Sequence, residues 1–221
     1  MPAMNEIERQ RDYWNREHAA FDAIYTHEKS ALSTMLDSIF RKDMYERYTE
    51  TLAACEPVEG RRFLDVGCGT GLYAIELARR GAAHVRGIDI AERMVETCQA
   101  RAREAGLENA VFSRGEAGDL PSAKEFDTSI AIGLFDYLPD AAQTLREMAL
   151  RTRTQLIATF PRLLTWRAPV RKLRLSLRGC PVYFYSAATV RKAYADAGLQ
   201  VIELRRIGKL YFVLARPASL E

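Results

Sequence analysis

The sequence predicts one α/β domain: a doubly wound, mostly parallel sheet of seven strands with helices on both faces, a helical N-terminal segment and an antiparallel hairpin at its end. Three observations predict this fold. From residue 61 onward, short apolar runs alternate with helical stretches, which is typical of parallel strands joined by helical crossovers. A glycine-rich turn follows the first run. The last two runs are separated only by residues 205–208, enough for a hairpin and too few for a crossover.

Residues 1–56 are predicted to form a helical lid over the ligand site of a domain that spans 57–221. Apolar residues with helical spacing indicate one amphipathic helix here: Leu32, Met35, Leu36, Ile39 and Phe40. An aromatic-rich segment around Tyr13, Trp14 and Tyr25 precedes it. Pro57 and Gly60 end the helical pattern.

The elements of the main domain follow in order. The predicted strands are Arg62–Val66, Val85–Ile90, Ala110–Ser113, Phe126–Ile132, Leu156–Phe160, Leu199–Leu204 and Lys209–Ala215. The predicted helices are Leu72–Arg80, Glu92–Glu104, Asp140–Arg151 and one that begins after the cap Ser186 and ends at Gly198.

Composition excludes several classes of protein. No apolar run approaches the roughly 20 residues that a membrane-spanning helix needs, and the polar N-terminus is unlike a secretory signal. The four cysteines are scattered and form no C-x-x-C pair, so we expect no metal site and a cytoplasmic location. A net charge of +3 is too small to indicate nucleic-acid binding.

The glycine-rich turn at 67–71 is the segment that indicates chemistry. Glycines let the backbone turn tightly and approach a ligand closely, and the following helix directs its free N–H groups to the same place. Leu72 stands where a dinucleotide fingerprint needs glycine, and the Gly-Lys-Ser/Thr of a phosphate-binding loop is absent. Asp65 would repel a pyrophosphate but suits a positively charged amino or sulfonium group. This combination favours a cationic nucleoside.

Two further acidic positions fit the same ligand. Asp89 ends the second strand, where a carboxylate can accept from both hydroxyls of a ribose, and it equally suits the start of the next helix. The turn at 115–121 carries Glu116 and Asp119, and a carboxylate with a neighbouring backbone N–H there would match an adenine edge. The same residues are also compatible with an exposed acidic turn that binds no ligand.

The run LDVGCGTG at 64–71, Asp89, GEAGDLP at 115–121 and FDTSIAIGLFDYL at 126–138 together resemble the class I S-adenosylmethionine-dependent methyltransferase family over about residues 61–160. The resemblance implies a Rossmann-like sheet and S-adenosylmethionine as cofactor. It implies that the methionine part is contacted by Asp65, Gly67, Cys68, Gly69 and Gly71, and the ribose by Asp89 and Ile90. It implies that the adenine is contacted by Glu116 and Ala117, and that Gly133 and Leu134 lie near the sulfur. The family often has aspartate at the position of Glu116, so Asp119 competes for that role.

The resemblance implies methylation of a small acceptor, with oxygen favoured over nitrogen or carbon. The sequence singles out no catalytic base: Asp136 and Tyr137 are the first candidates, and His18 and His27 follow. The alternative is a non-catalytic binding or accessory subunit with the same fold, which would activate a partner or contact a membrane through residues 161–180.

A basic segment follows the fifth strand, and six cations occur in it without an acid: Arg162, Arg167, Arg171, Lys172, Arg174 and Arg178. Three interpretations stay open: a solvated helix face, a substrate cap at about 161–182 for an anionic acceptor, and peripheral docking of 161–180 on anionic lipid. The region after Phe160 also resembles small-molecule O-methyltransferases of the magnesium-protoporphyrin type. The sequence leaves the oligomeric state open.

Overall fold

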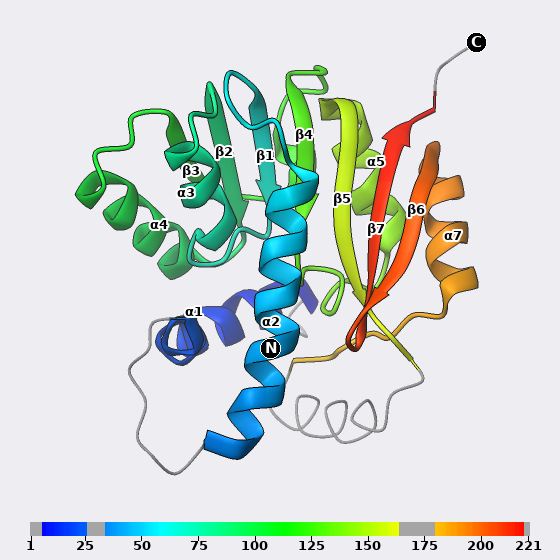
Figure 1. Ribbon diagram of the computed structural model, residues 1–221, viewed down its shortest axis with the longest axis horizontal. Helices are drawn as coiled ribbons and strands as arrows, with labels where there is room; N and C mark the ends of the chain where they lie inside the picture. The colour runs from blue at the N-terminus through cyan, green and yellow to red at the C-terminus, as the bar shows by residue number, and fades with distance from the viewer. Residues whose placement is uncertain (1–5, 26–33, 164–179, 219–221) are drawn as a thin grey trace, which may run out of the picture.

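The computed structural model describes residues 6–25, 34–163 and 180–218 and is built on one seven-stranded sheet (Figure 1). The strands lie in the order β3-β2-β1-β4-β5-β7-β6. The first five pair in parallel, while β7 is antiparallel to both β5 and β6. In chain order the strands are β1 Arg62–Val66, β2 His84–Asp89, β3 Ala110–Arg114, β4 Phe126–Ala131, β5 Thr152–Pro161, β6 Leu199–Ile207 and β7 Leu210–Pro217. The predicted fold class is confirmed.

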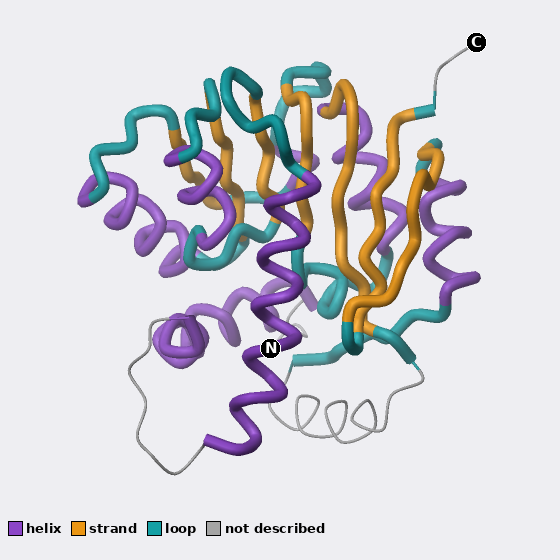
Figure 2. Tube along the Cα trace, in the orientation of Figure 1, coloured by secondary structure: helices purple, strands orange, loops and turns teal. Residues whose placement is uncertain are grey.

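Helices flank the sheet on both sides (Figure 2). They are α1 Glu6–Tyr25, α2 Thr34–Ala54, α3 Leu72–Arg79, α4 Glu92–Glu104, α5 Ala141–Arg151, α7 Ala187–Asp196 and the 3-10 turn η2 Ala117–Asp119. Two neighbouring residues of β1 belong to the cores on opposite faces of the sheet. Phe63 packs in the core formed with α2, α3 and α4, whereas Leu64 packs in the core formed with α5 and α7. Burial of both faces explains why the strand is a continuous apolar run.

The differences from the predicted elements have local causes. Strand β5 begins at Thr152, earlier than predicted, because the Thr152 hydroxyl is buried and bonded to Ser129 at 2.6 Å. Strand β6 extends to Ile207, since the guanidinium of Arg205 stacks 4.6 Å from the Phe212 ring centroid and pairs with Glu50. The cap at Ser186 is confirmed, because its hydroxyl accepts from the backbone N–H of Thr189 at 3.1 Å.

The N-terminal segment forms two helices, and α1 lies beyond the carboxyl ends of the parallel strands (Figure 1). Helix α2 runs to Ala54, well past the predicted apolar stripe. Leu32 of that stripe lies outside the described residues. The first helix is therefore near the edge of the sheet where a ligand of an open parallel sheet binds.

Candidate functional site

The turn between β1 and α3 has three glycines with positive φ: Gly67 at 70°, Gly69 at 55° and Gly71 at 84°. The N–H groups of Gly67 and Cys68 both donate to the carbonyl of Ile88, at 2.8 and 3.0 Å, and so attach the turn to β2. A Cβ atom at Gly67 would lie 2.8 Å from Cδ1 of Leu134. Glycine is required at 67 both by the backbone and by the close approach of the turn after β4.

Asp65 lies in β1 directly before this turn, and only 1% of the residue is exposed. Its Oδ2 atom has no hydrogen-bond partner among the described residues. Burial and then the charge of Asp89 raise the pKa of Asp65 to about 7, against a smaller opposing effect of the Ala74 backbone. A buried carboxylate is costly without a compensating charge, so this position suits a cationic group of a ligand.

Asp89 ends β2, and its carboxylate joins two turns. Oδ2 accepts from the N–H of Gly69 at 2.9 Å, and Oδ1 accepts from the N–H of Ala91 at 2.9 Å. Burial raises the pKa of Asp89, while these backbone donors lower it. A carboxylate has about four acceptor directions, so it can hold both turns and still accept from two hydroxyls. Half-buried Ile90 follows it in the same turn.

The two acids of the turn after β3 form a reciprocal capping box. The Asp119 carboxylate accepts from the backbone N–H of Glu116 at 2.8 Å, and the Glu116 side chain faces the backbone of Asp119 in return. The pKa of Glu116 is raised by partial burial and then by the charge of Asp119. Ala117 is buried in the core between them. Both acids therefore stabilise the turn, and its geometry does not choose between them for a ligand contact.

Gly133 and Leu134 follow β4 at the same edge of the sheet. Gly133 has a φ of 80°, and its N–H donates to the buried Thr159 hydroxyl of β5 at 2.9 Å. A Cβ there would lie 3.4 Å from Nη1 of Arg47, which α2 brings to this edge. The predicted ligand residues thus gather at the carboxyl ends of β1 to β4.

Helix α1 is fastened across this edge at two points. The side chain of Asn15 accepts from the N–H of Arg93, in the first turn of α4, at 3.2 Å. The Gln10 side chain donates to the carbonyl of Tyr137, and the ring of Trp14 meets the ring of Tyr137 edge-on at 4.9 Å. The helix therefore connects the start of α4 with the β4–α5 connection.

The candidate bases lie close to α1. Asp136 is buried, its backbone carbonyl accepts from the N–H of Tyr183 at 2.8 Å, and its charge adds to the burial that raises the pKa of Tyr185. Tyr137 is half-buried against Trp14, and the Nδ1 atom of His18 lies 3.1 Å from the carbonyl of Asn15. His27 lies outside the described residues. The geometry selects none of them as a base.

Most of the basic segment, residues 164–179, lies outside the described residues. Arg162, at its start, donates to the carbonyl of Gly208 at 3.0 Å and lies over the ring of Tyr211, so it is bound to the C-terminal hairpin. In the described ranges 6–25, 34–163 and 180–218, no group of side chains suited to a metal ion occurs. None of the helices in those ranges is long and apolar enough to cross a membrane.

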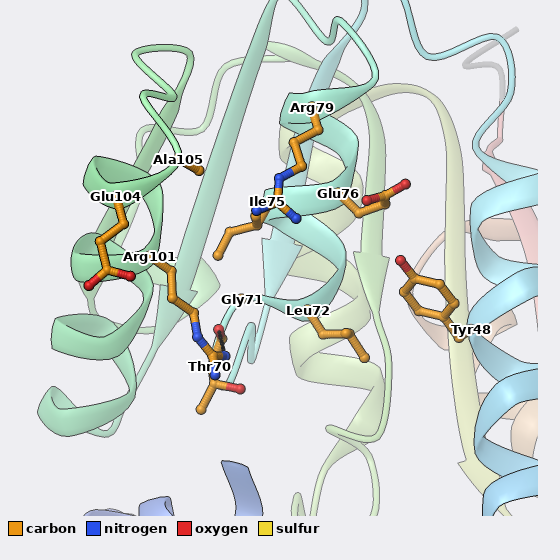
Figure 3. Close-up of a pocket in the computed structure, with 10 residues that line it drawn as sticks. All are labelled: Tyr48, Thr70, Gly71, Leu72, Ile75, Glu76, Arg79, Arg101, Glu104 and Ala105. Atoms are coloured by element: carbon orange, nitrogen blue, oxygen red, sulfur yellow. Dashed lines mark hydrogen bonds between the residues drawn. The ribbon is translucent and has the colours of Figure 1, made fainter. Parts of the chain in front are cut away.

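A cavity of about 370 Å³ lies between α3 and α4, behind the glycine turn (Figure 3). Its walls include Tyr48, Glu76, Arg79 and Arg101, and of the predicted ligand residues only Gly71 lines it. Arg101 reaches from α4 to donate to the carbonyl of Thr70 at 2.9 Å, which closes the cavity toward the turn. The cavity therefore adjoins the glycine turn and is not lined by the other predicted ligand residues.

Two features of the site were missed from the sequence. The Sγ atoms of Cys68 and Cys98 lie 4.0 Å apart beneath the glycine turn, although 30 positions separate them in the chain. All four cysteines are free and buried. Arg151 is buried beneath the turn that carries Glu116. No local pattern signals either feature, because both arise from packing of distant segments.

Comparisons with known proteins agree with this geometry. Residues 57–168, just over half of the chain, match the methyltransferase domain family. The ubiquinone biosynthesis O-methyltransferase of Neisseria meningitidis serogroup C (strain 053442) is 37% identical over 94 residues, which cover 42% of this chain and 40% of that protein. The magnesium-protoporphyrin O-methyltransferase of Rhodobacter capsulatus is 32% identical over 121 residues, which cover 54% of this chain and 50% of that protein. The chain thus spans about half or less of the length of these curated relatives.

A solved structure extends the likeness in fold beyond the matched domain. The magnesium protoporphyrin IX methyltransferase of Synechocystis PCC 6803 with bound SAH superposes with a TM-score of 0.72 at 24% identity. The superposition covers 93% of this chain and 96% of that chain, well beyond the matched domain. Domain match, strand order and glycine turn agree, and the chain belongs to the class I S-adenosylmethionine-dependent methyltransferase family.

Proposed function

We propose that the protein binds S-adenosylmethionine at the carboxyl ends of β1 to β4 and transfers its methyl group to an oxygen of a small-molecule acceptor. The observation that carries this proposal is Asp65, whose Oδ2 atom is buried without a hydrogen-bond partner among the described residues. A cationic ligand would compensate this charge, whereas a pyrophosphate would meet the two carboxylates of Asp65 and Asp89.

The residues at this edge fit the parts of the cofactor. Asp65 and the turn Gly67–Gly71, with Cys68, would hold the methionine part, and Asp89 with Ile90 the ribose hydroxyls. Glu116 and Ala117 would meet the adenine, and Gly133 with Leu134 would lie near the sulfur. The bound cofactor supplies a methyl group that its sulfonium already activates. The remaining task of the chain is to hold donor and acceptor in line and exclude water, which is worth roughly 7–11 kcal/mol of barrier.

We infer further that residues 1–56 act as a lid and that residues 161–182 cap the acceptor. The contacts of Asn15 with Arg93 and of Trp14 with Tyr137 support the lid, because they join both flanks of the cofactor edge. The cations of the basic segment support an anionic acceptor. Membrane docking of 161–180 is the competing role for this segment, and liposome co-sedimentation tests it.

Oxygen as the methylated atom is supported by the relatives. Their names include ubiquinone biosynthesis, 27-O-demethylrifamycin SV and magnesium-protoporphyrin methyltransferases, which differ widely in substrate. The acceptor class therefore has to come from experiment. Transfer of a labelled methyl group to panels of phenols, quinols and carboxylates separates O-methylation from simple binding.

Thermal unfolding with four separate ligands tests the cofactor. S-adenosylmethionine and S-adenosylhomocysteine should each stabilise the protein, by about 2.7 kcal/mol at 100 times the dissociation constant. For a domain of this size, that stabilisation raises Tm by roughly 5–10 °C. NAD and ATP should have no effect at the same concentrations. A shift with NAD alone would overturn the proposal.

A further inference from the structure

Arg151, the last residue of α5, is 1% exposed and is among the largest fully buried side chains of the described chain. Its guanidinium donates to the turn after β3 through two nitrogens. Nε donates to the carbonyl of Leu120 at 3.0 Å, and Nη2 donates to the carbonyls of Leu120 and Gly118, the latter at 3.2 Å. Nη1 donates to the carbonyl and the carboxylate of Glu147, at 2.6 and 2.8 Å.

Burial of a guanidinium is expensive, and an apolar side chain of similar size would fill the same space at lower cost. Glu147 offsets the charge and lies one helical turn away, so this ion pair alone needs nothing outside α5. The hydrogen bonds to the carbonyls of Gly118 and Leu120 are the ones that connect Arg151 to a segment outside α5. A planar guanidinium can bind two backbone carbonyls at fixed directions, which the point charge of a lysine does not do.

The turn that Arg151 holds is the turn that carries the proposed adenine contacts. Within the turn, Asp119 accepts from the N–H of Glu116, and the Ala117 side chain packs into the core. Both of these interactions shape the turn locally. Arg151 joins its backbone to α5 and thereby sets where Glu116 stands relative to the sheet.

We propose that Arg151 is a positioning residue for the adenine end of the cofactor site and acts through Glu116 and Ala117. This inference rests on the proposed function. An adenine would donate its 6-amino group to the Glu116 carboxylate and accept from the N–H of Ala117 at its N1. Hypoxanthine presents the opposite pattern at both positions, so a rigid turn should discriminate strongly between the two bases.

The test compares Arg151→Lys with wild type by titration calorimetry against S-adenosylhomocysteine and S-inosylhomocysteine. Wild type should prefer the adenosyl ligand at least tenfold. Arg151→Lys should weaken adenosyl binding about tenfold and reduce this preference to about twofold or less. A merely destabilised protein would weaken both ligands by the same factor, because a lower folded fraction leaves their ratio unchanged. Arg151→Gln, which keeps two N–H donors without a buried charge, replaces the lysine variant if that variant does not fold.

Arg153→Lys is the matched control. Arg153 lies two residues further along the chain and also donates to the carbonyl of a residue in the β3–β4 connection, Lys124, but at the end far from Glu116. It should keep the wild-type ligand ratio. A folded Arg151 variant with an unchanged ratio would overturn the positioning role. Failure of wild type to bind either ligand would instead overturn the proposed function, and the role of Arg151 with it.

Discussion

The proposed cofactor edge presents backbone groups and carboxylates at the carboxyl ends of β1 to β4, whereas the proposed acceptor side combines contacts of α1, the β4–α5 connection and residues 180–185. Asp65, the glycine turn and Asp89 lie within 25 positions of one another and are joined by backbone hydrogen bonds. On the acceptor side, Trp14 of α1 meets Tyr137 after β4, and Tyr183 bonds to the carbonyl of Asp136.

The two regions differ in the interactions that stabilise them. Strand ladders and positive-φ glycines hold the glycine turn, and the Asp89 carboxylate and the Arg151 guanidinium support the neighbouring turns of the cofactor edge. The acceptor side depends on packing of α1, which has few backbone ties to the sheet. We therefore expect changes at the cofactor edge to abolish binding in a folded protein, and changes at the acceptor side to loosen the structure locally.

The largest effect is expected for Asp65→Asn. Loss of the buried charge opposite a cationic ligand should weaken S-adenosylmethionine binding by roughly 100- to 4,000-fold, since breaking a buried ion pair costs about 3–5 kcal/mol. The unliganded variant should nevertheless be more stable than wild type at pH 8. Calorimetric titration and thermal unfolding measure the two effects.

The pH dependence sharpens this prediction. Because the fold raises the pKa of Asp65 from 3.8 to about 7, folded protein retains a proton that unfolded chain releases between these values. Wild-type stability therefore falls as pH rises from about 4 to 7, and Asp65→Asn should lack that fall. Asp127→Asn is the control, because that carboxylate accepts from the N–H of Arg62 at the opposite end of β1. Asp127→Asn should lower Tm and leave the affinity for S-adenosylmethionine unchanged. Equal losses of affinity in both variants would contradict the proposed contact of Asp65 with the cofactor.

Gly67→Ala should have the next largest effect. An alanine at positive φ costs roughly 1–2 kcal/mol, and its Cβ would lie 2.8 Å from Leu134 Cδ1, so the turn must move. We expect cofactor affinity to fall roughly tenfold to 100-fold. Gly60→Ala separates strain from site geometry, since Gly60 has a φ of 74° and no atom within 4 Å of the added Cβ. The control should lose similar stability but no affinity.

The same contrast explains which parts the sequence predicts. Strands such as Arg62–Val66 and the helix Glu92–Glu104 have the predicted bounds, because their apolar pattern and their glycine and proline neighbours are local signals. Asp65 and Asp89 were also recognisable, since each stands at a strand end beside a turn. These features need only short stretches of chain to specify them.

What could not be predicted depends on contacts between distant segments. Trp14 lies 123 positions before Tyr137, so no spacing rule connects them. The polar residues at the end of β6 carry no strand pattern, although in the fold the side chain of Arg205 contacts the distant Glu50 and the ring of Phe212. Long-range pairing decides each of these cases.

Trp14→Ala should loosen the acceptor side while sparing the cofactor edge. Loss of the edge-on contact with Tyr137 removes about 1.5–3 kcal/mol of packing, so amide hydrogen exchange of α1 should speed up roughly tenfold or more. Affinity for S-adenosylhomocysteine should change less than about threefold. Tyr45→Ala, at a tyrosine that is 71% exposed on α2, should change neither property. A loss of affinity as large as that of Asp65→Asn would place Trp14 in the cofactor site instead.

Asn15→Ala is expected to have the smallest effect and tests directly whether α1 gates the cofactor. The substitution removes one hydrogen bond, 3.2 Å long, to the N–H of Arg93, and such a bond contributes about 1 kcal/mol. If the lid must release α4 before the cofactor leaves, S-adenosylhomocysteine should dissociate about fivefold faster in a stopped-flow displacement, with Tm lowered by no more than roughly 2–4 °C. Arg16→Ala, at a neighbouring residue whose side chain donates within α1 to the carbonyl of Asp12, should dissociate like wild type. Equal dissociation rates in all three proteins would mean that α1 remains in place during exchange, and the cofactor edge would then open elsewhere.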